Sequence, residues 1–364
     1  MKIAYLLGSL NRGGLETLML DVCQNLQKTN FEAIGIYRKG GVLEELFLKS
    51  GVPFFKLEVG KSKIKYLLSL RKLILKNNVT IVHAQQPLDA IYAKLACIGT
   101  NVKIILTFHG FDFGAENKLL NYIIKKTDLN IYVSNYQRSH YVQKYGLNKS
   151  LQKVIYNGIN FSKFEQTKNK LENLRKELQV SETSLLLGMV GNFNEVRDQF
   201  SVCRFLKLLK QKRDDFHFVF VGKRVDSVAE RYDKCVEFCR DNELESRVSF
   251  LGVRNDVPEI LSQLDAFIYS TEHDTFGIAV VEAIAAGIPV FVNDWDVMRE
   301  ITEDGKLVNL YKSKDEEDLL EKFMLFLQNK KAYKEQAVEN AKMIRNKFGI
   351  EKHISELRTL YQSL

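Results

Sequence analysis

The chain has 364 residues, of which 45% are hydrophobic and 27% charged, and its formal net charge is +8. This length exceeds what one ordinary hydrophobic core needs and suits two domains of about 150 to 200 residues. The composition is typical of a soluble globular enzyme and excludes a collagen-like or largely disordered chain. No stretch reaches the roughly 18 apolar residues of a membrane span, so we expect a cytoplasmic protein.

Charge is unevenly distributed along the chain. Residues 1–160 contain 22 Lys/Arg and 10 Asp/Glu, a net of +12, whereas the remainder contains 31 and 35, a net of −4. A basic half indicates a phosphate-bearing ligand, nucleic acid or an anionic membrane surface, because each presents negative charge. The chain has no recognised nucleic-acid-binding motif, which disfavours the second of these partners.

Short apolar runs alternate with amphipathic segments in the first half of the chain. The runs predicted as strands are Ile3–Leu7, Ala33–Tyr37, Phe54–Leu57, Ile81–His83, Ile104–Phe108, Leu129–Val133 and Lys153–Tyr156. The segments predicted as helices span residues 15–28, 65–77, 88–98, 116–126 and 135–145. Continuous apolar strands separated by helices are typical of a parallel sheet covered on both faces.

The alternation pauses between residues 157 and 183 and then resumes. Predicted strands follow at Leu185–Val190, Phe216–Val221, Val248–Leu251, Ala266–Tyr269 and Pro289–Val292, with helices at 198–212, 227–241, 278–286, 316–328 and 331–347. Two consecutive doubly wound α/β units are therefore expected. In such sheets ligands bind at the carboxyl ends of the strands, so we expect functional residues in the loops that follow strands.

The first such loop contains two glycines. Gly13 and Gly14 follow the first predicted strand, and Glu16 lies just inside the helix that they open. Glycines let the backbone approach a ligand closely, and a helix N-terminus favours an anion. The spacing is not G-x-G-x-x-G, so a dinucleotide fingerprint is absent, and a plain tight turn is an equal alternative.

The second loop, residues 191–199, contains Asn192 and Arg197. An arginine there can hold a diphosphate through bidentate hydrogen bonds, with a solvated arginine as the alternative. A positive charge at a helix N-terminus opposes the helix dipole, so we expect a negative group nearby.

The third loop and its helix, residues 270–290, are the most specific segment. A polar loop follows the strand, and a helix begins near Gly277. The free amides of the first turn of this helix would face a phosphate. Glu282 lies on this helix among alanines, in a segment that otherwise has a buried pattern. A carboxylate there needs partners, which the hydroxyls of a sugar can provide; neighbouring backbone is the alternative.

This third segment resembles the signature of family 4 glycosyltransferases of GT-B fold, E-x7-E followed by A-x-A-x-G-x-P-V. The resemblance assigns Glu282 to the ribose hydroxyls of a nucleotide. It assigns Asp274, which stands where the family has Glu, to the transferred sugar. Phe276, Gly277 and Ile278 fall in the donor-binding segment, and the last two match the backbone that meets the diphosphate.

The resemblance extends over nearly the whole chain. Gly13-Gly14-x-Glu16 matches the family's first glycine loop, and Val154–Asn160 resembles V-I-x-N-G-I-D before the second domain. His83 and His109 fall on landmarks of the first domain. The resemblance places His109 in the cleft beside the donor sugar, and Glu16 and His83 on the acceptor side.

Two further segments of the second domain match the donor side of the family. Arg254 lies in a segment, residues 250–257, that resembles the loop holding the nucleotide base. Asn192 replaces the first of two cations in the family's G-R-x-x-x-x-K, whereas Arg197 keeps the second. Because the first cation is absent, we expect the donor phosphates to be bound more weakly or by a different arrangement of residues.

The resemblance implies two Rossmann-like domains facing a cleft. Residues 1–160, joined by a crossing helix at about 348–364, would bind the acceptor, and residues 161–347 would bind a nucleotide-sugar. It implies transfer of a hexosyl group from a UDP- or GDP-sugar with retention of configuration and without a metal or cofactor. His109, Arg197, Asp274 and Glu282 form the expected catalytic set, with Arg197 and the helix amides stabilising the leaving diphosphate.

Residues 61–76 form a basic amphipathic segment. It is predicted either to lie on an anionic bilayer or to be an ordinary outer helix of the sheet. The first alternative would place the protein on the inner face of the cell membrane, with access to a lipid-linked glycan in bacterial surface polysaccharide assembly. Two other functions stay open: a sugar-nucleotide epimerase of the same fold, and a non-catalytic nucleotide-sugar binder.

The five cysteines are scattered along the chain. Cys235 and Cys239 share a predicted helix face, but no Cys or His pair with ligand spacing completes a metal site. We therefore expect ordinary reduced core thiols.

Overall fold

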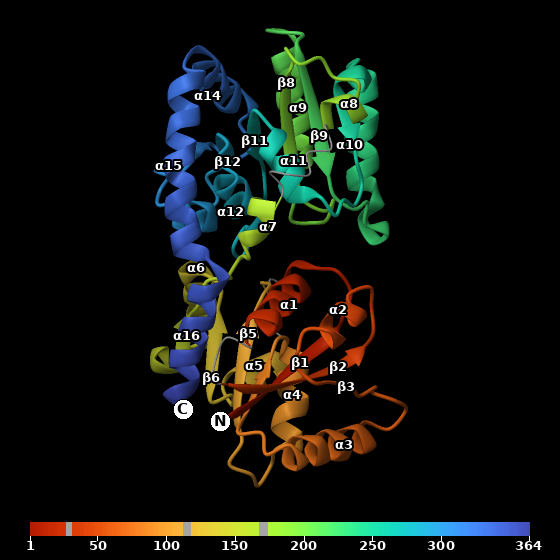
Figure 1. Cartoon of the computed structure of the whole chain (residues 1–364), viewed down its shortest axis with the longest axis vertical. Helices are drawn as coiled ribbons and strands as arrows, with labels where there is room; N and C mark the ends of the chain where they lie inside the picture. The colour runs from red at the N-terminus through yellow and green to blue at the C-terminus, as the bar shows by residue number, and fades with distance from the viewer. Residues whose placement is uncertain (27–30, 112–117, 167–173) are drawn as a thin grey trace. The chain divides into compact units, whose positions relative to one another are not determined.

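The computed structural model describes residues 1–26, 31–111, 118–166 and 174–364. The chain divides into two compact units, one formed by Met1–Asn160 with Phe348–Leu364 and the other by Phe161–Lys347. Each unit is built on a wholly parallel sheet with helices packed against it (Figure 1). The predicted doubly wound α/β architecture is confirmed for both units.

The first sheet has seven strands in the order β3-β2-β1-β4-β5-β6-β7. Their bounds are β1 Lys2–Ser9, β2 Glu32–Lys39, β3 Phe54–Lys56, β4 Ile81–Ala84, β5 Lys103–Phe108, β6 Leu129–Tyr132 and β7 Gln152–Val154. All seven were predicted. The chain begins at β1, runs outward to β3 and returns to β4 on the other side of β1. The carboxyl ends of β1 and β4 therefore flank the point at which the strand order reverses, where such sheets bind ligands.

Helices cover both faces of this sheet. They are α1 Gly14–Leu26, α2 Glu44–Leu48, α3 Lys63–Lys76, α4 Pro87–Ala96, α5 Lys118–Ile124, α6 Asn135–Tyr145 and α16 Ile350–Gln362, with a short 3-10 turn, η1, at Lys149–Leu151. Side chains alternate along a strand. Tyr5 accordingly packs in one core with α1 and α16, while Leu6 packs in another with α3 and α4. The predicted helices at 15–28 and 116–126 are described only in part, since residues 27, 28, 116 and 117 lie outside the described ranges.

The second sheet has the order β10-β9-β8-β11-β12-β13. Its strands are β8 Leu185–Val190, β9 Phe216–Val221, β10 Val248–Phe250, β11 Ala266–Tyr269, β12 Val290–Asn293 and β13 Asn309–Tyr311. The sequence did not predict β13, which has only three residues and exists because it pairs with β12. The order reverses between β8 and β11, so the loops after these two strands lie side by side.

The helices of the second unit include all those predicted and several short ones that were not. They are α7 Ser162–Gln166, α8 Leu174–Glu177, α9 Gln199–Lys210, α10 Ala229–Asp241, α11 Val257–Gln263, α12 Ile278–Ala285, α13 Asp296–Ile301, α14 Glu316–Gln328 and α15 Lys330–Phe348, with 3-10 turns η3 Asp226–Val228 and η4 Glu245–Arg247. None of the described helices combines the length and apolar character needed to cross a membrane.

The five cysteines all lie in described residues and are buried free thiols. Cys203 of α9 contacts Cys239 of α10 with a sulfur–sulfur distance of 3.9 Å. The packing of these two helices therefore brings a third cysteine to the pair that the sequence had singled out.

Helix α16 closes the first unit although it is the last element of the chain. The Ile159 amide donates to the Phe348 carbonyl at 2.8 Å, and the Ile350 amide donates to the Ile159 carbonyl at 3.0 Å. Gly158 permits this close approach, because a Cβ there would lie 2.6 Å from the Cβ of His353. The apolar side of α16 then completes the core beside α1.

Buried histidines fasten α16 to the rest of the unit. The Nδ1 atom of His353 lies 2.7 Å from the carbonyl oxygen of Tyr156, and Nδ1 of His83 lies 2.6 Å from Oη of Tyr361. Burial lowers the pKa of His353 to about 4 and that of His83 to about 3. Both side chains are therefore neutral in the folded protein at physiological pH.

These lowered pKa values predict acid sensitivity. An unfolded histidine titrates near 6.5, so the unfolded chain binds protons first as the pH falls. The stability from His353 is complete above about pH 6.5 and is lost as the pH falls toward 4, by roughly 2 kcal/mol between pH 6.5 and 5. His353→Asn, whose amide can still donate to Tyr156, should shrink the fall in unfolding free energy between pH 7.5 and 5 by about that amount. Urea titrations followed by circular dichroism measure this.

Glu351→Gln, an exposed change on the same helix, serves as the control and should leave that pH dependence as in the wild type. An equal acid sensitivity in His353→Asn and the wild type would show that His353 does not hold its neutral form in the folded state.

Candidate functional site

The loops after β8 and β11 meet at the reversal of the second sheet. Arg197, which precedes α9, and Thr271, which follows β11, form an isolated antiparallel bridge. The Asp198 amide donates to the Ser270 carbonyl at 3.1 Å, and the Glu272 amide donates to the Val196 carbonyl at 2.9 Å. These bonds join the second and third loops of the sequence analysis into one structure.

An ion pair lies at the centre of these joined loops. Arg197 Nη1 lies 3.1 Å from Asp274 Oδ2, and Nη1 also donates to Thr271 Oγ1 at 3.2 Å. The guanidinium carbon lies 5.3 Å from the centre of the Tyr269 ring. Asp274 is the negative group that the position of Arg197 led us to expect. Burial lowers the pKa of Arg197, but the electrostatic interactions with Asp274 and then with Tyr269 outweigh this effect and raise it.

Asp274 uses both of its carboxylate oxygens within the loop. Oδ2 pairs with Arg197 and accepts a hydrogen bond from Tyr269 Oη at 2.9 Å, while Oδ1 accepts from the Thr275 amide at 2.8 Å and more weakly from that of Phe276 at 3.4 Å. The short side chain of Asp favours hydrogen bonds to the amides that directly follow it, whereas Glu carries its carboxylate one methylene further out. The structure therefore gives a local reason for Asp where the family pattern has Glu.

The N-terminus of α9 is capped by its own chain. Asp198 accepts from the Ser201 amide at 3.2 Å and from the Ser201 hydroxyl at 2.6 Å. This capping role was not predicted, although an Asp three residues before a Ser at a helix start is a recognisable capping pattern. Asp198 takes one amide of the first turn and places a carboxylate at this helix end, so the Arg197 guanidinium is the cationic group that this loop offers to an anion.

The N-terminus of α12 is not capped in this way. Gly277 precedes the helix with φ 82° and ψ 53°, a left-handed conformation that favours glycine. Among the described residues, the amides of Ile278 and Ala279 have no hydrogen-bond partner. Glu282 lies one turn further along the same helix and is half-buried. This end of α12 therefore presents backbone donors to an anion.

The other predicted donor residues have structural partners. Asn192 Oδ1 accepts from the Lys223 amide at 2.8 Å, which ties the loop after β8 to the loop after β9. Arg254 is held by Asp256 and by Glu177 of α8, whose hydrogen bonds raise its pKa. The side chain of Phe276 is buried in the core of the unit, so only its backbone is placed to meet a ligand.

The predicted residues of the first unit behave differently from one another. Glu16 folds over Gly13, since a Cβ on that glycine would lie 2.6 Å from Glu16 Oε2, and burial raises the pKa of Glu16. His83 was predicted to lie on the acceptor side. In the structure it is 2% exposed, and its Nε2 lies 2.6 Å from Thr107 Oγ1. Because both ring nitrogens are used inside the fold, we assign His83 to packing and do not propose it as an acceptor ligand.

His109 lies at the carboxyl end of β5 and is half-buried. Its Nε2 lies 2.9 Å from Oε1 of Gln85, which follows β4, and burial lowers the pKa of His109 to about 3. Nε2 of Gln85 is buried and has no hydrogen-bond partner. A buried amide donor without a partner is costly, so this pair marks a place where the first unit can receive a ligand oxygen.

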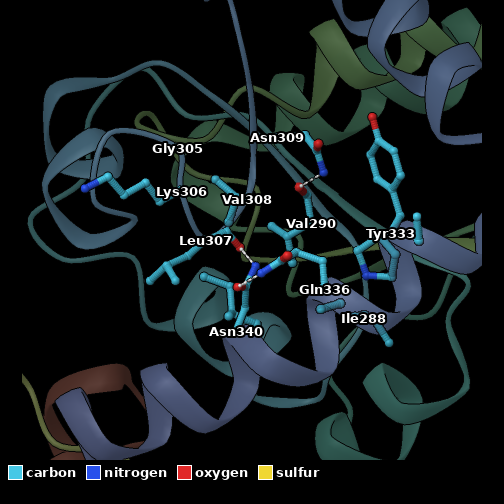
Figure 2. Close-up of a pocket in the computed structure, with 14 residues that line it drawn as sticks. Ile288, Val290, Gly305, Lys306, Leu307, Val308, Asn309, Tyr333, Gln336 and Asn340 are labelled. Atoms are coloured by element: carbon cyan, nitrogen blue, oxygen red, sulfur yellow. Dashed lines mark hydrogen bonds between the residues drawn. The ribbon is translucent and has the colours of Figure 1, made fainter. Parts of the chain in front are cut away.

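A separate cavity of about 440 Å³ lies elsewhere in the second unit (Figure 2). It borders the amino ends of β12 and β13 and one side of α15. Within its wall Asn340 donates to the Leu307 carbonyl at 3.0 Å and Asn309 to the Val290 carbonyl at 3.1 Å. The ion pair and the α12 N-terminus lie at the opposite, carboxyl ends of the strands, so this cavity is not part of the candidate site.

Two family models match the chain. The model described as "Glycosyltransferase Family 4" matches residues 12–163, and that described as "Glycosyl transferases group 1" matches residues 171–343. The chain belongs to the family 4 glycosyltransferases. Its fold is accordingly GT-B, with one Rossmann-like unit covered by each model.

Curated relatives of this glycosyltransferase include enzymes of known reaction. It is 26% identical over 296 residues to N-acetyl-alpha-D-glucosaminyl L-malate synthase of Bacillus anthracis, covering 79% of this chain and 75% of that protein. It is 24% identical over 311 residues to UDP-Gal:alpha-D-GlcNAc-diphosphoundecaprenol alpha-1,3-galactosyltransferase of Escherichia coli, covering 81% and 79%.

Solved structures share the fold of this glycosyltransferase over its full length. HepE of Anabaena, in complex with UDP and glucose, superposes with a TM-score of 0.87 at 18% identity, covering 100% of both chains. A glycosyltransferase of Rickettsia africae superposes with a TM-score of 0.88 at 20% identity, covering 100% of this chain and 98% of that one.

The short side chain of Asp274 can be tested by restoring the family's glutamate. Asp274→Glu keeps the charge but moves the carboxylate away from the amides of Thr275 and Phe276, so unfolding free energy should fall by about 1 to 3 kcal/mol. Trp295, the single tryptophan, donates to the Asp274 carbonyl at 3.3 Å, so its fluorescence reports unfolding at this loop. Asp241→Glu, an exposed change on α10, is the matched control. Equal stability of the two variants would contradict this account of Asp274.

Proposed function

We propose that this protein transfers a hexosyl group from a nucleotide-sugar, with UDP as the first candidate, to a glycan acceptor with retention of configuration. One observation carries the proposal. Arg197 and the uncapped N-terminus of α12 lie on joined loops at the reversal of the second sheet, with Glu282 one turn along that helix. A guanidinium, two unpartnered amides and a carboxylate suit a diphosphate joined to a ribose.

The electrostatics suit a leaving diphosphate. As the sugar departs, negative charge grows on the diphosphate, and donors already in place stabilise it without reorganisation. Among the described residues, Nε and Nη2 of Arg197 have no hydrogen-bond partner, so they remain for the phosphate. Asp274 is fully engaged with Arg197, Tyr269 and backbone. We therefore assign it to positioning the guanidinium rather than to holding the sugar.

The acceptor is proposed to be a glycan carried on a lipid diphosphate. The Escherichia coli relative is named for an acceptor of that kind, and other relatives are named for O-antigen biosynthesis. The basic charge of residues 1–160 supports binding of an anionic acceptor by the first unit. The pair formed by Gln85 and His109 offers a polar group for an acceptor hydroxyl or a donor sugar oxygen.

We propose that Lys223 binds a phosphate of the donor in place of the cation that the family has at position 192, where this chain has Asn. Lys223 follows β9, its amide is held by Asn192, and its exposed side chain has no ion pair among the described residues. The next residue, Arg224, is occupied by Asp233 at 2.7 Å. The loops after β8 and β9 are neighbours because their strands pair, so a lysine at 223 is placed near position 192.

A nucleotide screen tests the donor site. Purified protein is heated with UDP, GDP, UDP-glucose, UDP-galactose, UDP-N-acetylglucosamine or GDP-mannose, and its melting temperature is compared with that of the free protein. We expect one base to raise the melting temperature and Glu282→Ala to lose that rise. Glu335→Ala, a carboxylate on the outside of α15, should keep it. If no nucleotide stabilises the wild type, the donor site is refuted.

Product analysis separates the alternatives. With a synthetic lipid-diphosphate glycan, a transferase makes a longer glycan and releases nucleoside diphosphate, and proton NMR of the new linkage shows whether configuration is retained. An epimerase converts the sugar without an acceptor, and a non-catalytic binder shows a melting shift with no product. Either of these results would contradict the proposed transfer. The same assay with a chelator tests for a required metal.

Lys223→Gln should weaken nucleoside diphosphate binding by about 10 to 100 fold, the range for losing one charge-assisted hydrogen bond. Fluorescence of Trp295 or calorimetry measures the dissociation constant. Lys212→Gln, an exposed change after the carboxyl end of α9, should bind as the wild type does. Unchanged affinity in Lys223→Gln would leave Arg197 as the cation for both phosphates.

A further inference from the structure

Helices α3, α4 and α5 lie side by side on one face of the first sheet (Figure 1). Arg71 of α3 donates to the carbonyls of Ala96 and Ile98 at the end of α4, at 2.9 and 2.7 Å. The rings of Tyr66 on α3 and Tyr92 on α4 meet edge to face, 4.9 Å apart. Since the inner sides of these helices are buried against the sheet, their outer sides form one continuous layer toward solvent.

The outer side of this layer carries large apolar side chains. Ile64 is 71% exposed, Leu68 is 62% exposed and Ile98, just after α4, is 65% exposed. The other exposed apolar residues on the three helices are Leu75, Leu88, Leu95, Leu119 and Tyr122. Single exposed apolar residues are ordinary on a protein surface, but a group gathered over three neighbouring helices marks an interaction surface. We call these eight residues the α3–α5 face.

Within α3, α4 and α5 the exposed charged groups are all cations, whereas Glu58 and Asp128 in the flanking segments are paired with Lys56 and Lys103. These helices and their flanks carry the cations Lys61, Lys63, Lys65, Arg71, Lys72, Lys76, Lys94, Lys118, Lys125 and Lys126. The one carboxylate on the three helices is Asp89, which is buried and paired with Arg38 at 2.8 Å. None of the lysines forms an ion pair with another described residue. The surface is therefore apolar, basic and free of exposed carboxylates on these helices.

We infer that the α3–α5 face binds a lipid bilayer with anionic headgroups. Apolar side chains surrounded by lysines match such a surface, because the lysine stems lie along the hydrocarbon boundary while the ammonium groups reach the headgroup phosphates. Several juxtamembrane cations together bind such a membrane appreciably, whereas one does not. Of the two alternatives for residues 61–76, the structure favours the bilayer, because α4 and α5 extend the same chemistry.

The orientation of the helices relates this surface to the proposed acceptor. In a parallel α/β sheet the helices run opposite to the strands, so the N-termini of α3, α4 and α5 lie at the edge where the strands end. Gln85 and His109 lie at that edge. The next step rests on the proposed function: the lipid of the acceptor stays in the bilayer, and its glycan reaches this edge of the first unit.

Vesicle co-sedimentation of the full chain tests the inference. Vesicles of equal parts phosphatidylglycerol and phosphatidylcholine should carry the protein down at low salt, and vesicles of phosphatidylcholine alone should not. Ile64→Ser with Leu68→Ser should weaken binding about tenfold or more, since both lose an apolar group that enters the boundary. Lys65→Gln with Lys72→Gln should weaken it roughly 30 fold, or about fivefold for each charge.

The matched control is Val338→Ser with Met343→Ser on α15, where the two residues are 51% and 50% exposed. It should bind vesicles as the wild type does. Melting temperature and the nucleotide-induced shift are measured on every variant. Ile64→Ser with Leu68→Ser should keep both, which excludes misfolding as the cause of lost binding.

Several outcomes would overturn the inference. One is that the wild type does not bind anionic vesicles, and another is that the α3 variants bind them as well as the wild type does. A third is that light scattering shows a dimer that dissociates in the α3 variants, because that result would assign the face to a second copy of the chain. Vesicle binding without any nucleotide shift would refute the proposed donor site and keep this inference. A nucleotide shift without vesicle binding would refute this inference alone.

Discussion

The ion pair between Arg197 and Asp274 holds together the loops on which the candidate site is built. A largely buried guanidinium is stable only when a carboxylate compensates it, and removing one partner of such a pair leaves an uncompensated charge. Here the pair joins the end of β8 to the end of β11, and the backbone bridge from Arg197 to Thr271 follows the same path. The ion pair and the backbone bonds beside it fix these loops, from which α9 and α12 begin.

The sequence predicted the fold wherever an element was long enough to show a period. All strands of the first sheet and the long helices of both units were found. Several short elements were missed, among them α2, α11, α13 and β13. β13 has three residues and no alternation to detect, and it is a strand only because its backbone pairs with β12. Such elements are decided by tertiary contacts, which a single sequence does not display.

The sequence pointed to the individual residues of the candidate site but not to the contacts between them. Arg197, Asp274 and Glu282 each stood out by position, yet 77 residues separate the members of the ion pair, and only the adjacency of β8 and β11 brings them together. The packing role of His83 was not predicted, for the same reason. The partner of His83, Tyr361, is 278 residues away on α16, which packs against one face of the sheet. The contact with Tyr361 makes His83 a core residue. Likewise, α3 alone has an ambiguous amphipathic pattern, and only the topology sets α4 and α5 beside it.

The return of α16 to the first unit has a consequence for how the protein is made. Residues 161–347 are contiguous and can assume their fold as soon as the ribosome has released them, whereas the first unit still lacks the helix that covers one side of its core. Until Ile350, Ile354, Leu357 and Tyr361 emerge, apolar side chains of α1 and β1 have no cover. The core of the first unit therefore cannot be completed until the residues that follow the second unit have been synthesised. A chaperone that shields apolar surface would act longest on the part that was synthesised earliest.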